Sequence, residues 1–241
     1  MTVKSQAKPS RDKHDVTAGI IARAGQILVM FLIMGLMLFL GSGRIGWKAA
    51  WVFLGISLLS VAINAIFMLR NSPDTVAERA KPKEVKDWDR LIGGFWLIGQ
   101  YFLVPLLAGL DERFEWTMEY ATFWQAIGAG IYALALGLTG WAMISNAYFS
   151  TAVRIQSDRG QQVCRSGPYR FVRHPGYVGF FIQALCVPIL LGSLWALVFA
   201  IPAGVLMIIR TSLEDRLLQD ELPGYLEYTH EVRYRLIPGV W

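Results

Sequence analysis

Residues 27–40 read ILVMFLIMGLMLFL, without a single charged side chain. They lie inside a longer apolar block, 20–41, whose only charge is Arg23 near its start. A helix needs about 20 apolar residues to cross the hydrocarbon core of a bilayer. This block therefore predicts a membrane-spanning helix.

Five more apolar blocks follow it. Three of them have a similar length: 51–69, 91–110 and 120–144. Two shorter blocks come after a long polar loop: 177–191 and 194–209. At about 15 residues, each of these blocks is barely long enough to cross the bilayer by itself. Because Gly192 and Ser193 separate the two blocks, we expect a tight helical hairpin that is kinked at its prolines. The predicted fold is all-α: a polytopic membrane helix bundle of about six transmembrane segments, or of four plus a re-entrant hairpin, with short cytosolic C-terminal helices.

The composition agrees with a membrane protein. The chain has 241 residues, of which 54% are hydrophobic and 17% charged, whereas soluble domains average about 25% charged residues. The net charge of +5 is spread between the apolar blocks, where basic residues set topology or contact anionic lipids rather than nucleic acid. Cys164 and Cys186 form no CxxC or Cys/His set, so we expect neither a structural disulfide nor a bound metal.

Basic and non-basic loops alternate along the chain. Lys and Arg gather before the first block, between the second and third, and after the fourth and sixth. The loop between the third and fourth blocks is acidic instead, with Asp111, Glu112, Glu115 and Glu119. The positive-inside rule then places both termini and the polar C-terminal loops in the cytosol. The predicted organisation is a disordered cytosolic tail (1–16), an N-terminal four-helix membrane region (17–145) and a C-terminal catalytic region with a cytosolic cap (146–241).

The densest motif, GPYRFVRHPGYVG, covers residues 167–179 and leads into the fifth block. Pro175 disfavours helix at His174 and suits the first turn of the helix that follows. Arg173 and His174 are then held at the membrane surface beside the free N–H groups of a helix start, a place that attracts a carboxylate or phosphate. The alternative is that Arg173 snorkels to the interface and His174 merely caps a helix.

A second cluster stands at the end of the sixth block, where Arg210 is followed by Glu214 and Asp215. Arg210 and Glu214 are four residues apart and can pair on a helix face, which would be an ordinary surface pair if the cluster stood alone. A closed hairpin would instead bring it beside Arg173 and His174, as a polarised site for a zwitterionic ligand. The segment 221–238 that follows, ELPGYLEYTHEVRYRLIP, is either an interfacial helix with a Tyr belt or a cap over a ligand.

Taken in order, these three elements resemble the C-terminal half of the isoprenylcysteine carboxyl methyltransferase family, and phospholipid N-methyltransferases are similar in the same region. The family pattern is Gly-x-Tyr-x-x-x-Arg-His-Pro-x-Tyr-x-Gly, then a Glu-Glu pair, then Gly-x-x-Tyr-x-x-Tyr, and it matches about residues 146–238. The chain departs from it at Asp215, which replaces the second Glu, and at 180–183, where Phe-Phe-Ile-Gln replaces aromatic and polar residues of the eukaryotic enzymes. By the family's pattern, Asp215→Glu should be nearly silent.

The resemblance implies S-adenosyl-L-methionine as methyl donor. Its cofactor-binding residues would be Gly167, Tyr169, Arg173, His174, Pro175, Tyr177, Gly179 and Glu214. Its catalytic residues would be Arg173, Arg210, Glu214 and Asp215. The implied activity is methyl transfer to a lipophilic or lipid-modified acceptor on the cytosolic side of the membrane, among membrane lipids and without nucleic acid or metal.

The acceptor stays open among isoprenyl-thioether carboxylates, lipid amines and small thiols. Two other functions remain as alternatives. One is an NADPH-dependent reductase of the sterol-reductase type, which would need a cationic site for an extra phosphate. The other is a membrane transporter or structural subunit, although such pathways usually bury charges within the spans.

Overall fold

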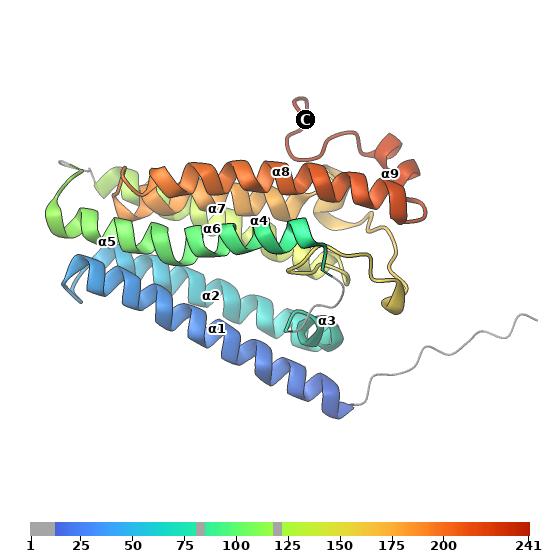
Figure 1. Cartoon of the computed structure of the whole chain (residues 1–241), viewed down its shortest axis with the longest axis horizontal. Coiled ribbons are helices and arrows are strands. Elements are labelled where there is room, and N and C mark those ends of the chain that lie inside the picture. Colours follow the sequence, from blue (N-terminus) through green and yellow to red (C-terminus); the bar gives the residue numbers. More distant parts are fainter. Residues whose placement is uncertain (1–12, 81–84, 118–121) are drawn as a thin grey trace, which may run out of the picture.

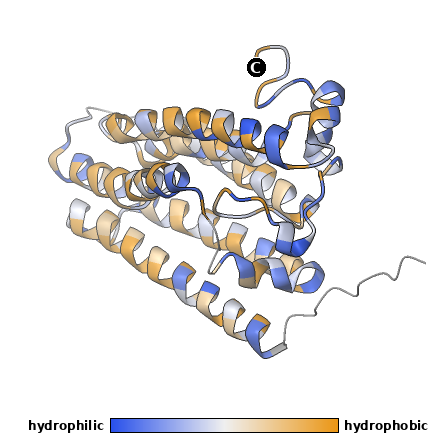
Figure 2. Cartoon of the chain, turned by 45° about the vertical axis from the view of Figure 1, so that its right-hand side comes forward, coloured by the Kyte–Doolittle hydropathy of each residue, from blue (hydrophilic) through white to orange (hydrophobic). Residues whose placement is uncertain are grey.

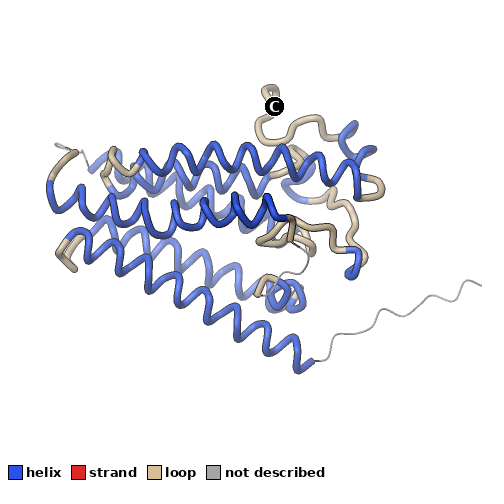
Figure 3. The backbone as a smooth tube through the Cα atoms, in the orientation of Figure 1, coloured by secondary structure: helices blue, strands red, loops and turns tan. Residues whose placement is uncertain are grey.

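A computed structural model describes residues 13–80, 85–117 and 122–241. Within these ranges all regular structure is helical, as predicted, and the long helices lie side by side in one bundle (Figures 1 and 3). The long helices are α1 (Lys13–Ser42), α2 (Lys48–Asn71), α4 (Asp87–Ile98), α5 (Val104–Phe114), α6 (Thr122–Ser145), α7 (Pro175–Leu191) and α8 (Leu197–Glu221). The short ones are α3 (Pro73–Glu78), η1 (Gly99–Leu103), η2 (Ser157–Arg159), η3 (Gly167–Arg170) and α9 (Tyr225–Glu231).

Five helical stretches of the described chain are long and apolar enough to cross a membrane: His14–Ser42, Lys48–Asn71, Asp87–Phe114, Thr122–Ser145 and Leu197–Glu221. Apolar residues cover the bundle's flanks in Figure 2, and Leu134 in the middle of α6 is 75% exposed. An exposed apolar belt of this extent is the surface that lipid covers. The chain is thus built as an integral membrane protein, with α7 as a shorter apolar helix of 17 residues.

Several bounds differ from the predicted blocks. Helix α8 continues to Glu221, so Arg210 and Asp215 belong to the same continuous helix as the sixth apolar block. Helix α1 begins at Lys13, inside the predicted tail 1–16, and residues 1–12 lie outside the described residues. Sequence composition locates an apolar block well, but a helix continues past it for as long as its polar residues find partners.

The third span is a single helix with an irregular turn in its middle. Helices α4 and α5 are continuous through η1, which has π-helical hydrogen bonding. Pro105, just beyond this turn, lacks an amide hydrogen and its ring conflicts with the carbonyl four residues earlier, so the helix widens locally. The turn carries Gln100 in a buried position.

Different connections and short helices lie at the two ends of the bundle. The α1–α2 connection, the end of α5 and the α7–α8 turn meet at the left in Figure 1, whereas α3 and α9 lie at the right. At the left-hand end Ser193 donates a hydrogen bond to Asp111, and the amide of Leu194 donates to Thr117 Oγ1 at 3.1 Å. The α7–α8 turn therefore reaches the end of α5.

Glycines let α6 and α7 approach each other closely. A Cβ on Gly179 would lie 2.0 Å from Thr139 Oγ1, and one on Gly128 would lie 2.7 Å from the Leu190 amide nitrogen. Only glycine fits at such separations. This contact sets the position of α7, and with it the position of the Arg173-His174-Pro175 sequence at its start.

Candidate active site

Asp215 lies at the centre of a buried polar cluster near the right-hand end of the bundle. Its side chain is fully buried and accepts hydrogen bonds from five described side chains. Its Oδ1 accepts hydrogen bonds from Arg173 Nε (2.8 Å) and the Tyr225 hydroxyl (3.0 Å), and it lies 3.1 Å from His174 Nε2. Its Oδ2 accepts hydrogen bonds from Arg173 Nη2 (3.0 Å), Gln219 Nε2 (2.8 Å) and Arg235 Nε (2.7 Å). We call these six residues the Asp215 cluster. Because a carboxylate has about four lone-pair positions, Asp215 has none left for a ligand.

Arg173 joins this cluster to the C-terminal segment. Its Nη1 donates to the carbonyls of Val232 (2.9 Å) and Arg233 (2.7 Å). The backbone amides of Arg173 and His174 donate to the carbonyls of Tyr234 and Arg235 at 2.9 and 3.0 Å. A guanidinium has five N–H donors, and these contacts together with the two to Asp215 commit four of them.

Electrostatics keeps the cluster in one protonation state. Burial alone would lower the pKa of Arg173, but the Asp215 carboxylate outweighs it and the pKa is raised. Burial, and then the charge of Asp215, raises the pKa of the Tyr225 hydroxyl well above its usual value. The cluster therefore holds a charged Arg173 and a neutral Tyr225 across the physiological pH range.

The local sequence accounts for the position of Arg173 and His174. Gly167 has φ = 58°, a left-handed conformation that favours glycine, and starts the short helix η3. His174 is the N-cap of α7, outside helical geometry, and Pro175 occupies the first helical position. This is the arrangement that Pro175 predicts.

Arg210 pairs differently from the expectation. Its guanidinium binds Asp89 of α4 through two hydrogen bonds, at 2.6 and 3.1 Å, and not Glu214. Both side chains are at least nine-tenths buried. Glu214 instead accepts a hydrogen bond from the Tyr177 hydroxyl, and the Arg210 guanidinium lies over the Tyr177 ring at 5.5 Å. A buried arginine takes the partner that tertiary packing brings within reach, and here that partner is Asp89.

The other predicted site residues divide into two sets. Tyr177 stacks on His174 with ring centroids 5.7 Å apart, so Tyr177, Glu214 and Arg210 adjoin the Asp215 cluster. Tyr169 and Gly167 contact the end of α6, since the Tyr169 hydroxyl accepts from Asn146 at 3.4 Å and a Cβ on Gly167 would meet Ser145. Gly179, as described, faces α6.

Four residues of this region escaped the sequence analysis: Asp89, Gln219, Tyr225 and Arg235. Asp89 and Arg235 lie among other charged residues, and nothing in their spacing connects them with Asp215 or Arg210. Tyr225 was noted only as part of a Tyr belt. Its OH–Asp215 bond depends on how α9 folds back on α8.

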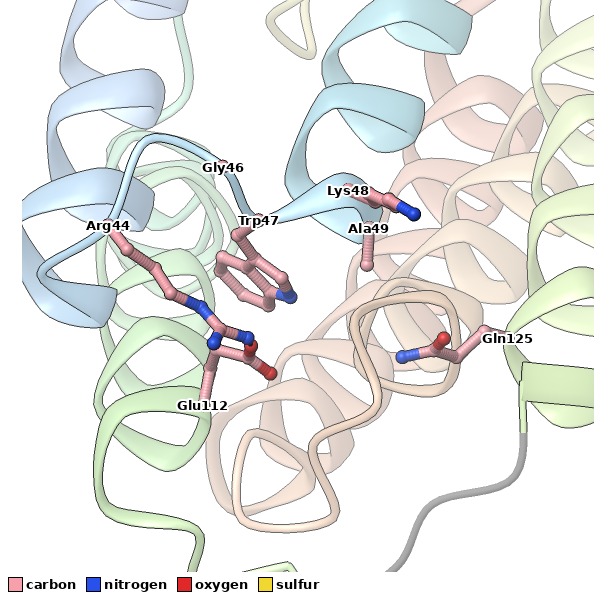
Figure 4. A pocket seen from close by; sticks show the side chains of 7 residues that line it. All are labelled: Arg44, Gly46, Trp47, Lys48, Ala49, Glu112 and Gln125. Atoms are coloured by element: carbon pink, nitrogen blue, oxygen red, sulfur yellow. The ribbon is translucent and has the colours of Figure 1, made fainter.

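A separate hollow of about 490 Å³ lies at the opposite end of the bundle (Figure 4). It is lined by Arg44, Gly46, Trp47, Lys48, Ala49, Glu112 and Gln125. Two of its three charged residues, Arg44 and Glu112, pair with each other, and Arg44 is mostly exposed. The hollow is wide open and contains no residue of the Asp215 cluster, so we assign it no part in this site.

Residues 129–220 match the family model of the Isoprenylcysteine carboxyl methyltransferase (ICMT) family. The predicted resemblance is thereby confirmed for the C-terminal half. The ICMT match runs from α6 to the end of α8 and includes Arg173, His174, Arg210 and Asp215. The chain is also 28% identical over 162 residues to an uncharacterized Bacillus subtilis (strain 168) protein, YpbQ, a stretch that covers 65% of this chain and 94% of that protein. The ICMT match and the apolar helices together fit a membrane methyltransferase.

Proposed function

We propose that the chain is an integral membrane, S-adenosylmethionine-dependent methyltransferase that acts on a lipophilic acceptor at the cytosolic end of the bundle. The observation that carries this proposal is the Asp215 cluster. It joins Arg173, at the start of α7, to Asp215 of α8 and to Tyr225 and Arg235 of the C-terminal segment. Arg173 and Asp215 both lie within the ICMT match. A built, buried polar site of this kind is unlike a lipid-facing structural helix end.

The residues of this region suit the methyl donor, but their hydrogen bonds change the roles expected of Glu214 and Asp215. Glu214 is half-buried, and within the described chain its carboxylate accepts a hydrogen bond only from the Tyr177 hydroxyl, so it has positions left for an ammonium group. The positive charge of Arg173 and the start of α7 suit a carboxylate. Asp215 then acts as a positioning residue that holds Arg173 and His174. When bound, the donor supplies an electrophilic methyl group, and the protein contributes orientation and exclusion of water.

Glu214 provides a direct test of the donor site. Glu214→Gln is expected to weaken donor binding and to lower turnover at least tenfold, equivalent to about 1.4 kcal/mol, because the amide no longer attracts an ammonium. Calorimetric titration with S-adenosylmethionine measures the binding. Glu227→Gln, at an exposed position of α9, is the matched control and should bind the donor normally. Equal binding by Glu214→Gln and wild type would remove Glu214 from the donor site, and a protein that binds NADPH but not the donor would favour the reductase alternative.

We further propose six crossings with both termini cytosolic. The contacts of Ser193 and Leu194 with the end of α5 support this topology over a re-entrant hairpin, because they bring the α7–α8 turn to the level of the acidic loop. In a cysteine-free background, a membrane-impermeant thiol reagent added outside should label cysteines introduced at Glu115 and Leu194 and miss one at Gln161. Labelling of Gln161 from outside would reverse the sidedness, and protection of Leu194 alone would support the re-entrant form.

A further inference from the structure

A cavity of about 260 Å³ lies among the membrane-spanning helices, apart from the Asp215 cluster. Its lining comes from α1, α2, α4, η1, α6 and α7, with additional residues from α3 and the position after it. Most of the lining is apolar and includes Met34, Phe53, Leu136 and Val187. In such a cavity a few polar groups decide which apolar ligand is bound and in which orientation.

Some polar side chains of this lining find their partners inside the bundle. The Ser57 hydroxyl lies 2.8 Å from the Tyr132 hydroxyl, and Gln183 Nε2 donates to Thr139 Oγ1 at 2.8 Å. These contacts join α2 to α6 and α6 to α7. They serve the packing of the bundle, and they need nothing from a ligand.

Three polar atoms of the spans make no hydrogen bond within the described chain: Asn64 Oδ1, Trp96 Nε1 and Gln100 Nε2. All three atoms are buried, and all three residues line the cavity. A fourth such atom of the lining, Arg79 Nη2, follows α3 and lies outside the spans. Buried polar groups almost always have a partner, so these atoms call for a ligand or for water.

Trp96 and Gln100 together form a pair of donors on the third span. They are four residues apart, so their side chains lie on the same side of the helix, about one turn from each other. An indole nitrogen can only donate, and Gln100 Nε2 is a donor as well. Gln100 belongs to the π-helical turn η1 near the middle of the span, and turns of this kind often occur at functional sites.

Asn64 supplies an acceptor from α2. Its Nδ2 donates to the Ser60 carbonyl at 3.0 Å, which fixes the orientation of the amide and leaves Oδ1 toward the cavity. The three atoms are thus two donors and one acceptor, and all belong to neutral side chains. A ligand group that meets them at this depth is neutral too, because a charge inside the hydrocarbon layer is costly without a countercharge.

The cavity adjoins the candidate active site through Phe180, which is part of its lining. The rings of Trp96 and Phe180 are 5.4 Å apart, and those of Phe180 and Tyr177 are 6.1 Å apart. Tyr177 donates its hydroxyl to Glu214. A molecule bound at Trp96 is therefore separated from the Tyr177–Glu214 pair by a single aromatic ring.

We propose that this cavity binds a lipid whose apolar chain carries a neutral carbonyl group, and that Trp96 and Gln100 recognise the carbonyl oxygen. The oxygen has two lone pairs and can accept a hydrogen bond from both donors. Where the carbonyl is part of an amide, its N–H can also donate to Asn64. A chain made only of hydrocarbon, such as an isoprenyl group, would leave all three atoms without a partner. The inference goes beyond the proposed function and does not rest on it, because it concerns lipid recognition and not methyl transfer.

Photo-crosslinking in the absence of the methyl donor tests this inference. The full-length protein in lipid nanodiscs is irradiated with an analogue of dihexyl ketone that carries a diazirine at one chain end, and the crosslinked peptides are mapped. We expect crosslinks on the α1 and α2 segments that line the cavity. Unlabelled dihexyl ketone should compete at least tenfold better than tridecane, the alkane of the same chain length. Equal competition by the two compounds would assign these polar atoms to water and overturn the inference.

Trp96→Phe removes the indole N–H and keeps an aromatic ring. In this variant competition by dihexyl ketone should weaken at least tenfold, and competition by tridecane should stay unchanged. Gln100→Leu should act in the same direction. Trp124→Phe, at an exposed tryptophan of α6 that does not line the cavity, is the matched control and should behave as wild type. Undiminished ketone competition in both Trp96→Phe and Gln100→Leu would overturn the inference.

Two further measurements on Trp96→Phe separate ligand recognition from a structural role. A carbon-13-labelled dihexyl ketone bound to wild type should show its carbonyl stretch at a lower infrared frequency than in lipid alone, and Trp96→Phe should reverse part of this shift. Without ketone, Trp96→Phe should unfold at no lower temperature than wild type, because it loses a donor that has no partner. A carbonyl frequency in wild type equal to that in lipid would overturn the inference. Unfolding of Trp96→Phe well below wild type would also overturn it, because the N–H would then serve the fold.

Discussion

Replacing Asp215 with asparagine is expected to destabilise the protein by about 3–5 kcal/mol, the usual cost of removing one partner from a buried ion pair. The guanidinium groups of Arg173 and Arg235 would then face an amide in place of a carboxylate, at a position with no exposed surface. Donor binding should be lost together with stability, since the cluster positions Arg173 and His174. Thermal unfolding of the purified protein and donor titration measure the two effects.

Two further substitutions make this test specific. Asp220→Asn removes a carboxylate from an exposed position of the same helix and should leave unfolding unchanged. Asp215→Glu, which the family pattern predicts to be nearly silent, should instead destabilise by about 1–3 kcal/mol, because the additional methylene has no room in a filled, fully bonded site. Wild-type unfolding of Asp215→Asn would show that the cluster contributes nothing to the fold.

Breaking the pair between Asp89 and Arg210 is expected to have an effect of similar size, about 3–5 kcal/mol for either Asp89→Asn or Arg210→Ala. The pair connects α4 with α8, and Asp89 also accepts the Val153 amide at 2.7 Å. Since the two residues share one interaction, the double variant should lose clearly less than the sum of the single losses. Arg210→Ala should also lower turnover, because Arg210 lies over the Tyr177 ring.

Asp87 offers the matched control for this pair. It forms an ion pair with Arg90 one turn along α4, but both side chains are largely exposed, at 98% and 65%. Such pairs are screened by water, so Asp87→Asn should unfold as wild type does. Additive losses in the Asp89–Arg210 double variant would mean that the two residues stabilise the bundle independently.

Composition alone determined the membrane character of this protein and the place of most of its helices. A spanning helix satisfies its backbone internally and needs only a long enough run of apolar side chains, which is a local property. The start of α7 was equally predictable, because Pro175 restricts His174 through direct covalent geometry. The family motif pointed to Arg173, His174 and Asp215, and the structure does bring these three together.

The partners of the charged residues were decided by the tertiary structure. Arg210 pairs with Asp89, 121 residues away, and not with Glu214, four residues away, because the rotation of α8 turns the guanidinium toward α4. Asp215 is surrounded by donors from the α7 start, its own helix, α9 and the C-terminal segment, which a spacing rule on one helix does not describe. The burial of Arg79 was likewise decided by the tertiary structure. In the sequence Arg79 looks like any basic loop residue, and only tertiary packing removes it from water, with no ion pair to any residue that the structure describes.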